Sequence, residues 1–241
     1  MVSALLSCLS PAYGAKALFR NRTMALILGL GLLPAVAQAQ EAAEVPVIVA
    51  LGDSLTQGYG LPADQGFVPQ LQDWLTAQGV GAGIVNAGVS GDTTAGGAAR
   101  LDWSLSGDVD ALIVNLGGND LLRGLDPDVS RANLEKIMDG AAARDLPVLL
   151  VGLSAPGNYG ADFKTRYDAI FPDLAERFDA LLMPDFLAPL RDAGGEAAAA
   201  ARFMQADGIH PSAEGVAVIV ESIGPQVVDL IGRVSQPDAG G

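Results

Sequence analysis

The feature that most constrains the fold is the alternation of short, continuously apolar segments with longer segments whose apolar residues recur at helical spacing. Continuous apolarity is typical of strands that are buried on both faces of a parallel sheet, with helices covering each face. The pattern therefore predicts one α/β domain of about five parallel strands. The predicted strands are Val45 to Leu51, Ile84 to Ala87, Asp110 to Leu116 and Val148 to Leu153, with a weaker fifth at Leu181 to Met183.

Four segments between and after these strands carry apolar residues on one helical face, as helices that pack against a core do. The stripes contain Val68, Leu71 and Leu75; Leu134, Ile137, Met138 and Ala141; Tyr167, Ile170, Phe171, Leu174 and Phe178; and Val216, Ile219, Val220 and Ile223. Pro172 lies inside the third stripe. Because proline has no backbone N–H and clashes with the preceding turn, we expect it to kink that helix or to begin a new one.

Composition limits the classes of function. Half of the 241 residues are hydrophobic, which is enough for a single domain with a sizeable core. Lys and Arg number 14 against 28 Asp and Glu, and the net charge is −14. Since the basic residues are scattered singly, we expect no nucleic-acid partner. Cys8 is the only cysteine, so the chain beyond it has no disulfide, thiolate metal site or cysteine nucleophile.

The first 39 residues predict a signal peptide. Small residues at Ala37 and Ala39 suit a signal peptidase, and a basic start precedes an apolar run: Lys16, Arg20 and Arg22, then Met24 to Ala37. Cleavage after Ala39 removes these three basic residues and no acidic one, which takes the net charge from −14 to −17. Pro34 makes the run a poor membrane span. We therefore expect an exported protein, periplasmic or secreted, without stable membrane insertion; an uncleaved anchor helix is the alternative.

After this leader we expect a domain over residues 40–234 and a disordered tail over residues 235–241. Open α/β sheets bind ligands beyond the carboxyl ends of their strands. Four polar blocks are expected to meet there, three after predicted strands and one before the last predicted helix: Gly52-Asp53-Ser54-Leu55, Ser90-Gly91-Asp92-Thr93, Gly117-Gly118-Asn119-Asp120 and Asp207-Gly208-Ile209-His210-Pro211.

The last of these blocks contains His210, the only histidine of the chain. Asp207 lies three residues earlier, across a glycine, so its carboxylate can hold one imidazole nitrogen while the other faces a hydroxyl. Ser54 is the best candidate for that hydroxyl, because it follows a buried strand in a turn that Gly52 allows. A serine needs a base to become nucleophilic. The alternatives are a structural or surface histidine and a helix-capping serine, and we assign Asp53 a turn-stabilising role.

Acyl transfer also needs hydrogen-bond donors for the negative oxygen of the tetrahedral intermediate, and each is worth on the order of 3 kcal/mol. Three candidates follow the predicted strands: the backbone N–H of Ser54, the backbone N–H of Gly91 and the side-chain amide of Asn119. A glycine at position 91 lets the N–H approach without a Cβ in the way. Asn119 as an ordinary turn residue is the alternative.

Several motifs of other enzyme classes are absent from the sequence. It contains no Gly-x-Ser-x-Gly nucleophile elbow, no His-Glu-x-x-His zinc motif, no phosphate-binding P-loop and no Gly-x-Gly-x-x-Gly. A single histidine excludes a histidine-rich metal centre, although a carboxylate-only site has no characteristic spacing to search for. We therefore expect a site without cofactor or metal.

The four blocks, in this order, resemble those that define the GDSL or SGNH hydrolases, named after their catalytic Ser, Gly, Asn and His. Two further stretches, Leu122-Arg123-Gly124 and Asn158-Tyr159-Gly160, are similar to the periplasmic multifunctional acyl-CoA thioesterase, lysophospholipase and arylesterase subgroup. The resemblance implies a three-layer, flavodoxin-like fold, no cofactor, and an acyl-enzyme formed on Ser54, with Asp207 and His210 completing the triad. It also implies an oxyanion hole made by Ser54, Gly91 and Asn119.

The resemblance further implies a mobile loop from Leu121 to Pro127, with Leu121, Leu122 and Leu125 beside the acyl pocket; local packing is the alternative role of these leucines. The leading hypothesis is thus an exported esterase, monomeric or a small homo-oligomer, that hydrolyses short- to medium-chain acyl esters, including aryl esters, thioesters and lysophospholipids. A carbohydrate O-acetyl esterase with the same site is the first alternative. A non-catalytic, flavodoxin-like binding domain is the second.

Overall fold

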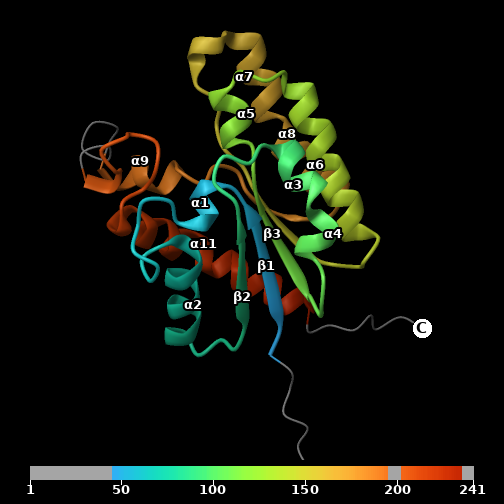
Figure 1. Cartoon of the computed structure of the whole chain (residues 1–241), viewed down its shortest axis with the longest axis vertical. Coiled ribbons are helices and arrows are strands. Elements are labelled where there is room, and N and C mark those ends of the chain that lie inside the picture. The colour runs from blue at the N-terminus through green and yellow to red at the C-terminus, as the bar shows by residue number, and fades with distance from the viewer. Residues whose placement is uncertain (1–44, 195–201, 235–241) are drawn as a thin grey trace, which may run out of the picture. The chain divides into compact units, whose positions relative to one another are not determined.

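The structure, a computed structural model, describes residues 45–194 and 202–234. The predicted signal peptide and the predicted C-terminal tail lie outside the described residues. Five strands form one parallel sheet in the order β2-β1-β3-β4-β5, which is the flavodoxin-like order (Figure 1). They are β1 (Val47–Gly52), β2 (Gly83–Gly88), β3 (Ala111–Asn115), β4 (Val148–Val151) and β5 (Leu181–Met183).

The predicted set of five parallel strands is confirmed, with ends that shift by one or two residues because hydrogen-bonded pairing, and not apolarity, ends a strand. Strands β3 and β4 are buried along their whole length, and β1 is buried except at its first residue. Strand β2 lies at the edge of the sheet and is partly exposed. The continuous apolar runs therefore mark the three central strands.

Helices cover both faces of the sheet and complete three layers (Figure 1). On one face, α2 (Phe67–Ala77) packs against α11 (Ala213–Val234). On the other lie α3 (Thr94–Ala99), α4 (Leu101–Ser104), α6 (Pro127–Ala142) and α8 (Ile170–Arg177). The shorter elements α1 (Ser54–Gln57), α5 (Gly118–Leu122), η1 (Gly157–Tyr159), α7 (Ala161–Asp168) and α9 (Ala188–Gly194) complete the described helices.

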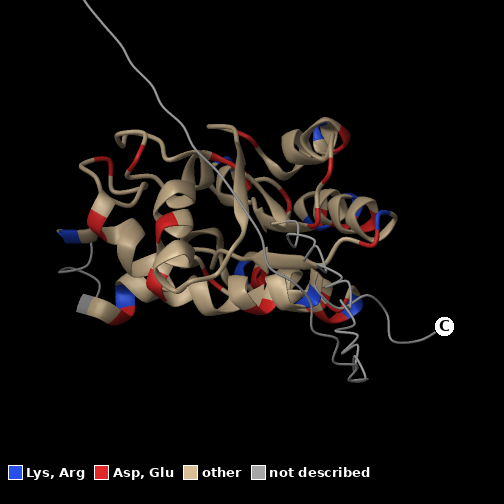
Figure 2. Ribbon diagram, turned by 90° about the horizontal axis from the view of Figure 1, so that it is seen from below, with Lys and Arg blue, Asp and Glu red and all other residues tan. Residues whose placement is uncertain are grey.

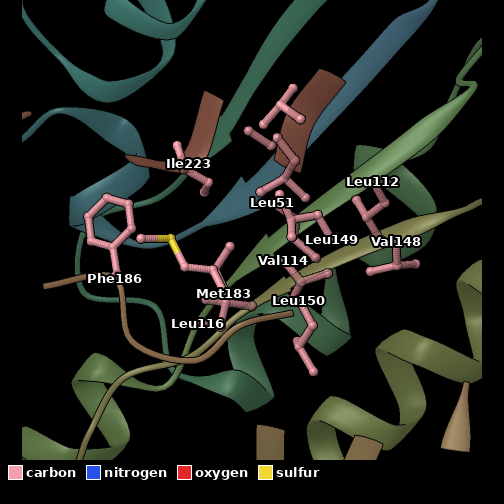
Figure 3. Close-up of a cluster of buried hydrophobic side chains, with 14 of the residues drawn as sticks. Leu51, Leu112, Val114, Leu116, Val148, Leu149, Leu150, Met183, Phe186 and Ile223 are labelled. Carbon is pink, nitrogen blue, oxygen red and sulfur yellow. The ribbon is translucent and has the colours of Figure 1, made fainter. Parts of the chain in front are cut away.

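The core lies between the sheet and these helices. Figure 3 shows part of it, with side chains of β1, β3, β4 and β5 together with Ile223 of α11. Helix α11 is long and apolar enough to cross a membrane by length and composition. Its apolar stripe is instead buried in this core: Val216, Ile219, Val220, Ile223, Val227 and Leu230. The composition of α11 is thus explained by packing.

The third predicted stripe is divided between two helices, α7 and α8, which meet at Ala169. Pro172 is the third residue of α8. The first N–H groups of a helix have no partner within it, so a proline costs little at this position. The second of the two outcomes expected for Pro172, the start of a new helix, is the one observed.

Acidic residues are spread over the helices and loops, with basic residues placed among them (Figure 2). Several of the basic residues pair with an acid, as Arg144 does with Asp102 and Arg131 with Asp173. Such exposed pairs contribute little to stability. The described surface shows the scattered charge that the sequence predicts.

Two glycines of α11 allow a matched test of the packing between α2 and α11. A Cβ on Gly224 would lie 2.6 Å from the Trp74 ring, whereas nothing lies within 4 Å of a Cβ on Gly232. We expect Gly224→Ala to lower the free energy of unfolding by about 1–3 kcal/mol through overpacking. Gly232→Ala should raise it by up to about 1 kcal/mol, because alanine is the better helix former. Urea unfolding measures both, and equal effects of the two changes would contradict this account of the interface.

Candidate active site

Three of the four polar blocks line a cleft of about 420 Å³ at the carboxyl end of the sheet, and the block Ser90-Gly91-Asp92-Thr93 contributes no residue to its lining. Ser54, Asn119 and His210 all line this cleft, although they come from the start of α1, from α5 and from the loop before α11. The remaining lining residues are Asp53, Leu55, Gly118, Leu121, Leu122, Leu153, Ser154, Pro156, Asn158, Tyr159, Leu187, Met204, Gly208 and Ile209. The cleft lies between β1 and β3, the point at which the strand order reverses and open sheets bind ligands.

Ser54, His210 and Asp207 form a continuous hydrogen-bonded chain. The Ser54 Oγ lies 2.8 Å from His210 Nε2, and His210 Nδ1 lies 2.7 Å from Asp207 Oδ2. An ionised carboxylate can only accept, so Nδ1 carries the proton and Nε2 is left to accept from the hydroxyl. Ser54 and His210 are 156 residues apart in the sequence, and only the fold brings them into contact.

The loop that carries His210 is fixed by its own short-range contacts. Asp207 Oδ1 accepts from the N–H groups of Ile209, at 2.9 Å, and of His210, at 3.0 Å. Gly208 takes the left-handed φ of +67° that this tight turn requires. Ser212 Oγ accepts from the Gly215 N–H at the start of α11, as predicted for a helix start after Pro211. The carboxylate and the imidazole are therefore mounted on one rigid turn.

These hydrogen bonds also determine the charge of Asp207. The bond from His210, with the two backbone N–H groups, lowers the pKa of the Asp207 carboxyl to about 2. The group therefore stays ionised at any pH near neutrality. An ionised Asp207 fixes the imidazole tautomer, and a carboxylate in this position can stabilise an imidazolium at His210.

Asp53 lies beside Ser54 in the opposite environment. Its carboxyl is buried, and burial raises its pKa to about 6 although the Leu55 N–H, at 3.0 Å, and the Asn119 amide, at 3.3 Å, both donate to it. The bond from Leu55 is the turn-stabilising contact that the sequence predicts. The bond from Asn119 is a second one, which joins the turn after β1 to the segment after β3.

Two of the three residues predicted to supply oxyanion donors line the cleft, and the third does not. The N–H of Ser54 is among the first of α1, and such groups have no partner within the helix. Asn119 lines the cleft, whereas Gly91 is not among the lining residues. Gly91 has a left-handed φ of +85°, and its carbonyl accepts from Arg123 Nη2 at 2.8 Å. The role of all three as oxyanion donors stays a prediction.

The three predicted substrate-contact leucines do not share one position. Leu121 and Leu122 line the cleft, and Leu125 is not among its lining residues. The stretch predicted as a mobile loop, Leu121 to Pro127, is made of the end of α5, a short turn and the first residue of α6. In that turn the Leu125 N–H donates to the backbone carbonyl of Asp120, which closes the turn after α5. Leu125 therefore does not continue the row of Leu121 and Leu122 along the cleft.

Sequence reasoning missed several residues of the site. The ring of Tyr59 packs on the imidazole of His210, with centroids 4.7 Å apart. Arg100 and Asp120 make buried or half-buried hydrogen bonds just behind the cleft. No local spacing marks the contacts of Tyr59 and Asp120, because each joins elements far apart in sequence. Arg100 bonds both to the nearby Asp92 and to the distant Gly52. Within the described ranges, no group of three or more His, Cys, Asp or Glu is arranged to hold a metal ion.

The arrangement supplies the parts of nucleophilic acyl transfer: a hydroxyl, a base that can take its proton, a carboxylate that orients the base, and donors beside an apolar cleft. None of these parts depends on a second histidine or a cysteine.

The raised pKa of Asp53 predicts how stability depends on pH. The carboxyl titrates at about 6 in the folded chain against 3.8 as its ordinary value, so the folded state favours the protonated form. The contribution of protonated Asp53 to the free energy of unfolding is complete below pH 3.8 and is lost as the pH rises through 6. The free energy of unfolding of the wild type should therefore fall by about 3 kcal/mol relative to Asp53→Asn between pH 3.5 and 7. Urea unfolding of both proteins across this range measures the difference, and a constant difference would contradict the prediction.

Comparison with known proteins places the chain in a family. Residues 50–218 match the model of the GDSL-like lipase/acylhydrolase family. The esterase TesA of Pseudomonas aeruginosa is 36% identical over 209 residues, which cover 86% of this chain and 100% of that protein. Thioesterase 1/protease 1/lysophospholipase L1 of Escherichia coli K12 is 34% identical over 195 residues, which cover 80% of this chain and 89% of that protein.

A solved structure agrees with these matches. The crystal structure of AlinE4, an SGNH-hydrolase family esterase, is 42% identical and superposes with a TM-score of 0.63 over 77% of this chain and 96% of that one. The five-stranded parallel sheet flanked by helices is therefore the SGNH-hydrolase fold, and the chain belongs to the GDSL-like lipase/acylhydrolase family.

Proposed function

We propose that this protein is a serine esterase, exported from the cytoplasm, that hydrolyses short- to medium-chain acyl esters, including aryl esters, thioesters and lysophospholipids, through an acyl-enzyme on Ser54. The observation that carries the proposal is the chain of contacts from Ser54 Oγ through His210 to Asp207 at the edge of an apolar cleft. The two relatives described above are named as an esterase and as a thioesterase/protease/lysophospholipase.

In the first step, His210 Nε2 takes the proton of Ser54 Oγ as that oxygen attacks the carbonyl carbon of the ester. The carbonyl oxygen becomes negative and accepts hydrogen bonds from Ser54 N–H, Gly91 N–H and the Asn119 amide. The intermediate then collapses, and His210 gives its proton to the departing oxygen or sulfur. Water, deprotonated by His210, then attacks the acyl carbon. The bond from that carbon to Ser54 Oγ breaks, His210 returns the proton to Oγ, and the acid is released.

The lining of the cleft supports the proposed range of acyl chains. Leu121, Leu122, Leu153 and Ile209 present apolar surface beside Ser54, and a volume of about 420 Å³ accommodates a chain longer than acetyl. Each methylene that leaves water for such a surface gains about 0.8 kcal/mol. Thioesters require no other machinery, because the same base protonates a departing thiolate.

The proposal of export is supported by the leader pattern of the first 39 residues, where a basic start and an apolar run precede Ala37-Gln38-Ala39. An exported enzyme meets acyl esters of the envelope or of the medium, and it works without cysteine, whose only copy lies in that leader.

The assignment of nucleophile and base is tested by two substitutions. We expect Ser54→Ala and His210→Ala each to lower kcat for p-nitrophenyl butyrate by on the order of 10⁵-fold or more, since members of a triad act as a unit. Ser106→Ala, a serine on the distant α4–β3 connection that bonds only to Trp103 O, should retain full activity. Circular dichroism and urea unfolding report that the variants are folded, and a folded Ser54→Ala with undiminished activity would refute the assignment.

The acyl cleft is tested by a series of p-nitrophenyl esters from acetate to octanoate. We expect kcat/KM to rise beyond acetate by up to about fourfold per methylene until the cleft is filled. Leu122→Ala should reduce this gain. Val129→Ala, which changes an exposed apolar residue of α6 that does not line the cleft, should leave the gain unchanged. A rate that falls steadily from acetate upward would reject the acyl cleft and favour a carbohydrate O-acetyl esterase.

A further inference from the structure

Helix α3 lies directly behind the three turns that carry the predicted oxyanion donors. Its first residue, Thr94, follows the block that contains Gly91. The helix is seated closely: a Cβ on Gly96 would lie 2.5 Å from Asp92 Oδ1, and a Cβ on Gly97 would lie 2.2 Å from Leu116 Cδ1. Two side chains, Asp120 and Arg100, connect this helix to the turns after the other two strands.

Asp120 is the residue after Asn119, and its carboxyl is 1% exposed. It accepts from Thr94 N–H at 2.8 Å, from Thr94 Oγ1 at 2.6 Å and from Ser130 Oγ at 3.0 Å. Among the ion pairs of the described residues, none involves Asp120, so its burial is compensated by neutral donors. A buried polar group that is held by three bonds in one geometry fixes the backbone on which it stands.

The partners of Asp120 are themselves fixed by α6. Asn133, nearly one turn beyond Ser130 on the buried side of that helix, donates from Nδ2 to Thr94 Oγ1 at 3.3 Å. Thr94 Oγ1 therefore donates to Asp120 and accepts from Asn133. The segment that carries Asn119 is thus bonded to α3, and α3 in turn to α6.

Arg100 makes the corresponding connection for the other two donors. Its Nε donates to Asp92 Oδ2 at 2.6 Å, and its Nη2 donates to Gly52 O at 2.8 Å. Asp92 is the residue after Gly91, and Gly52 ends the strand that leads to Ser54. Because a guanidinium is planar and its donors are fixed in direction, one side chain sets the distance between the two turns.

We propose that Asp120 and Arg100 are positioning residues that hold the oxyanion donors in one arrangement through α3, Asp120 acting on Asn119 and Arg100 acting on the turns of Ser54 and Gly91. The proposal rests on the proposed function, in which these donors stabilise the tetrahedral intermediate. Such donors act only when they are preorganised, and a displacement of about 1 Å can lower the rate by about 10²-fold.

Because Asp120 and Arg100 are proposed to position different donors, a double-mutant cycle with Asn119→Ala can separate their effects on kcat. Asn119→Ala should lower kcat for p-nitrophenyl butyrate by about 10²- to 10³-fold. Asp120→Asn should lower kcat by about 10²-fold with little change in KM, but by less than about threefold in the Asn119→Ala background, where there is no amide left to position. Arg100→Gln should lower kcat by the same factor in both backgrounds, because it acts on the other donors.

Thr94→Val provides a second arm that disturbs the fold less, because it removes only the hydroxyl and keeps the Thr94 N–H bond to Asp120. It should lower kcat in the wild type and have almost no effect in the Asn119→Ala background. Arg144→Gln, which breaks the exposed pair between Arg144 and Asp102 on the neighbouring α4, is the control and should leave kcat unchanged.

Three outcomes would overturn the proposal: unchanged kcat in Asp120→Asn and Thr94→Val, a loss in Asp120→Asn that is equal in the wild-type and Asn119→Ala backgrounds, or a loss in Arg100→Gln that disappears when Asn119 is replaced. Equal losses in Asp120→Asn would show that Asp120 has a structural role alone. Failure here is distinguishable from failure of the proposed function, because Ser54→Ala tests the latter. An Asn119→Ala variant with full activity overturns the Asp120 arm while the triad stands.

Discussion

The site depends on the close approach of α1 to the ends of three parallel strands. Gly52 pairs in register with Gly88 of β2 and with Asn115 of β3, which aligns the carboxyl ends of all three. A Cβ on Gly52 would lie 2.0 Å from Thr56 Oγ1, and one on Gly88 would lie 2.3 Å from Gln57 N. Only glycines allow α1, and with it Ser54, to lie directly on the strand ends, next to the segments that carry Gly91 and Asn119.

Two aspartates beside Ser54 and His210 show how environment separates the roles of identical groups. Asp53 is buried, and its pKa is raised to about 6, while Asp207 at the surface receives three hydrogen bonds that lower its pKa to about 2. Asp207 therefore holds a permanent charge next to the imidazole. Asp53 is better suited to holding its turn and the Asn119 amide in place.

The residues around the cleft fall into two groups: polar residues that are hydrogen-bonded at the strand ends, and apolar residues that form the walls. The triad geometry and the bonds behind it come from polar residues at the strand ends, and they are compatible with any acyl ester. The walls of the cleft are apolar, and α5, the loop after β4 and the His210 loop all contribute to them, so we expect substrate choice to depend on these walls. A family with one chemistry can therefore serve different esters by changing these loops.

The sequence by itself determined the five strands, the core stripes and the four polar blocks, because periodicity and strand-end position are local properties of the chain. It also pointed to Ser54, Asp207 and His210, since one histidine with a nearby aspartate leaves few alternatives. Only the tertiary structure decided the rest. Tyr59 on the His210 ring, Asp120 on Thr94 and Arg100 on Gly52 join distant segments, and Leu125, close in sequence to Leu121, does not line the cleft. Such contacts depend on how helices and loops pack across the sheet, and no local pattern encodes that packing.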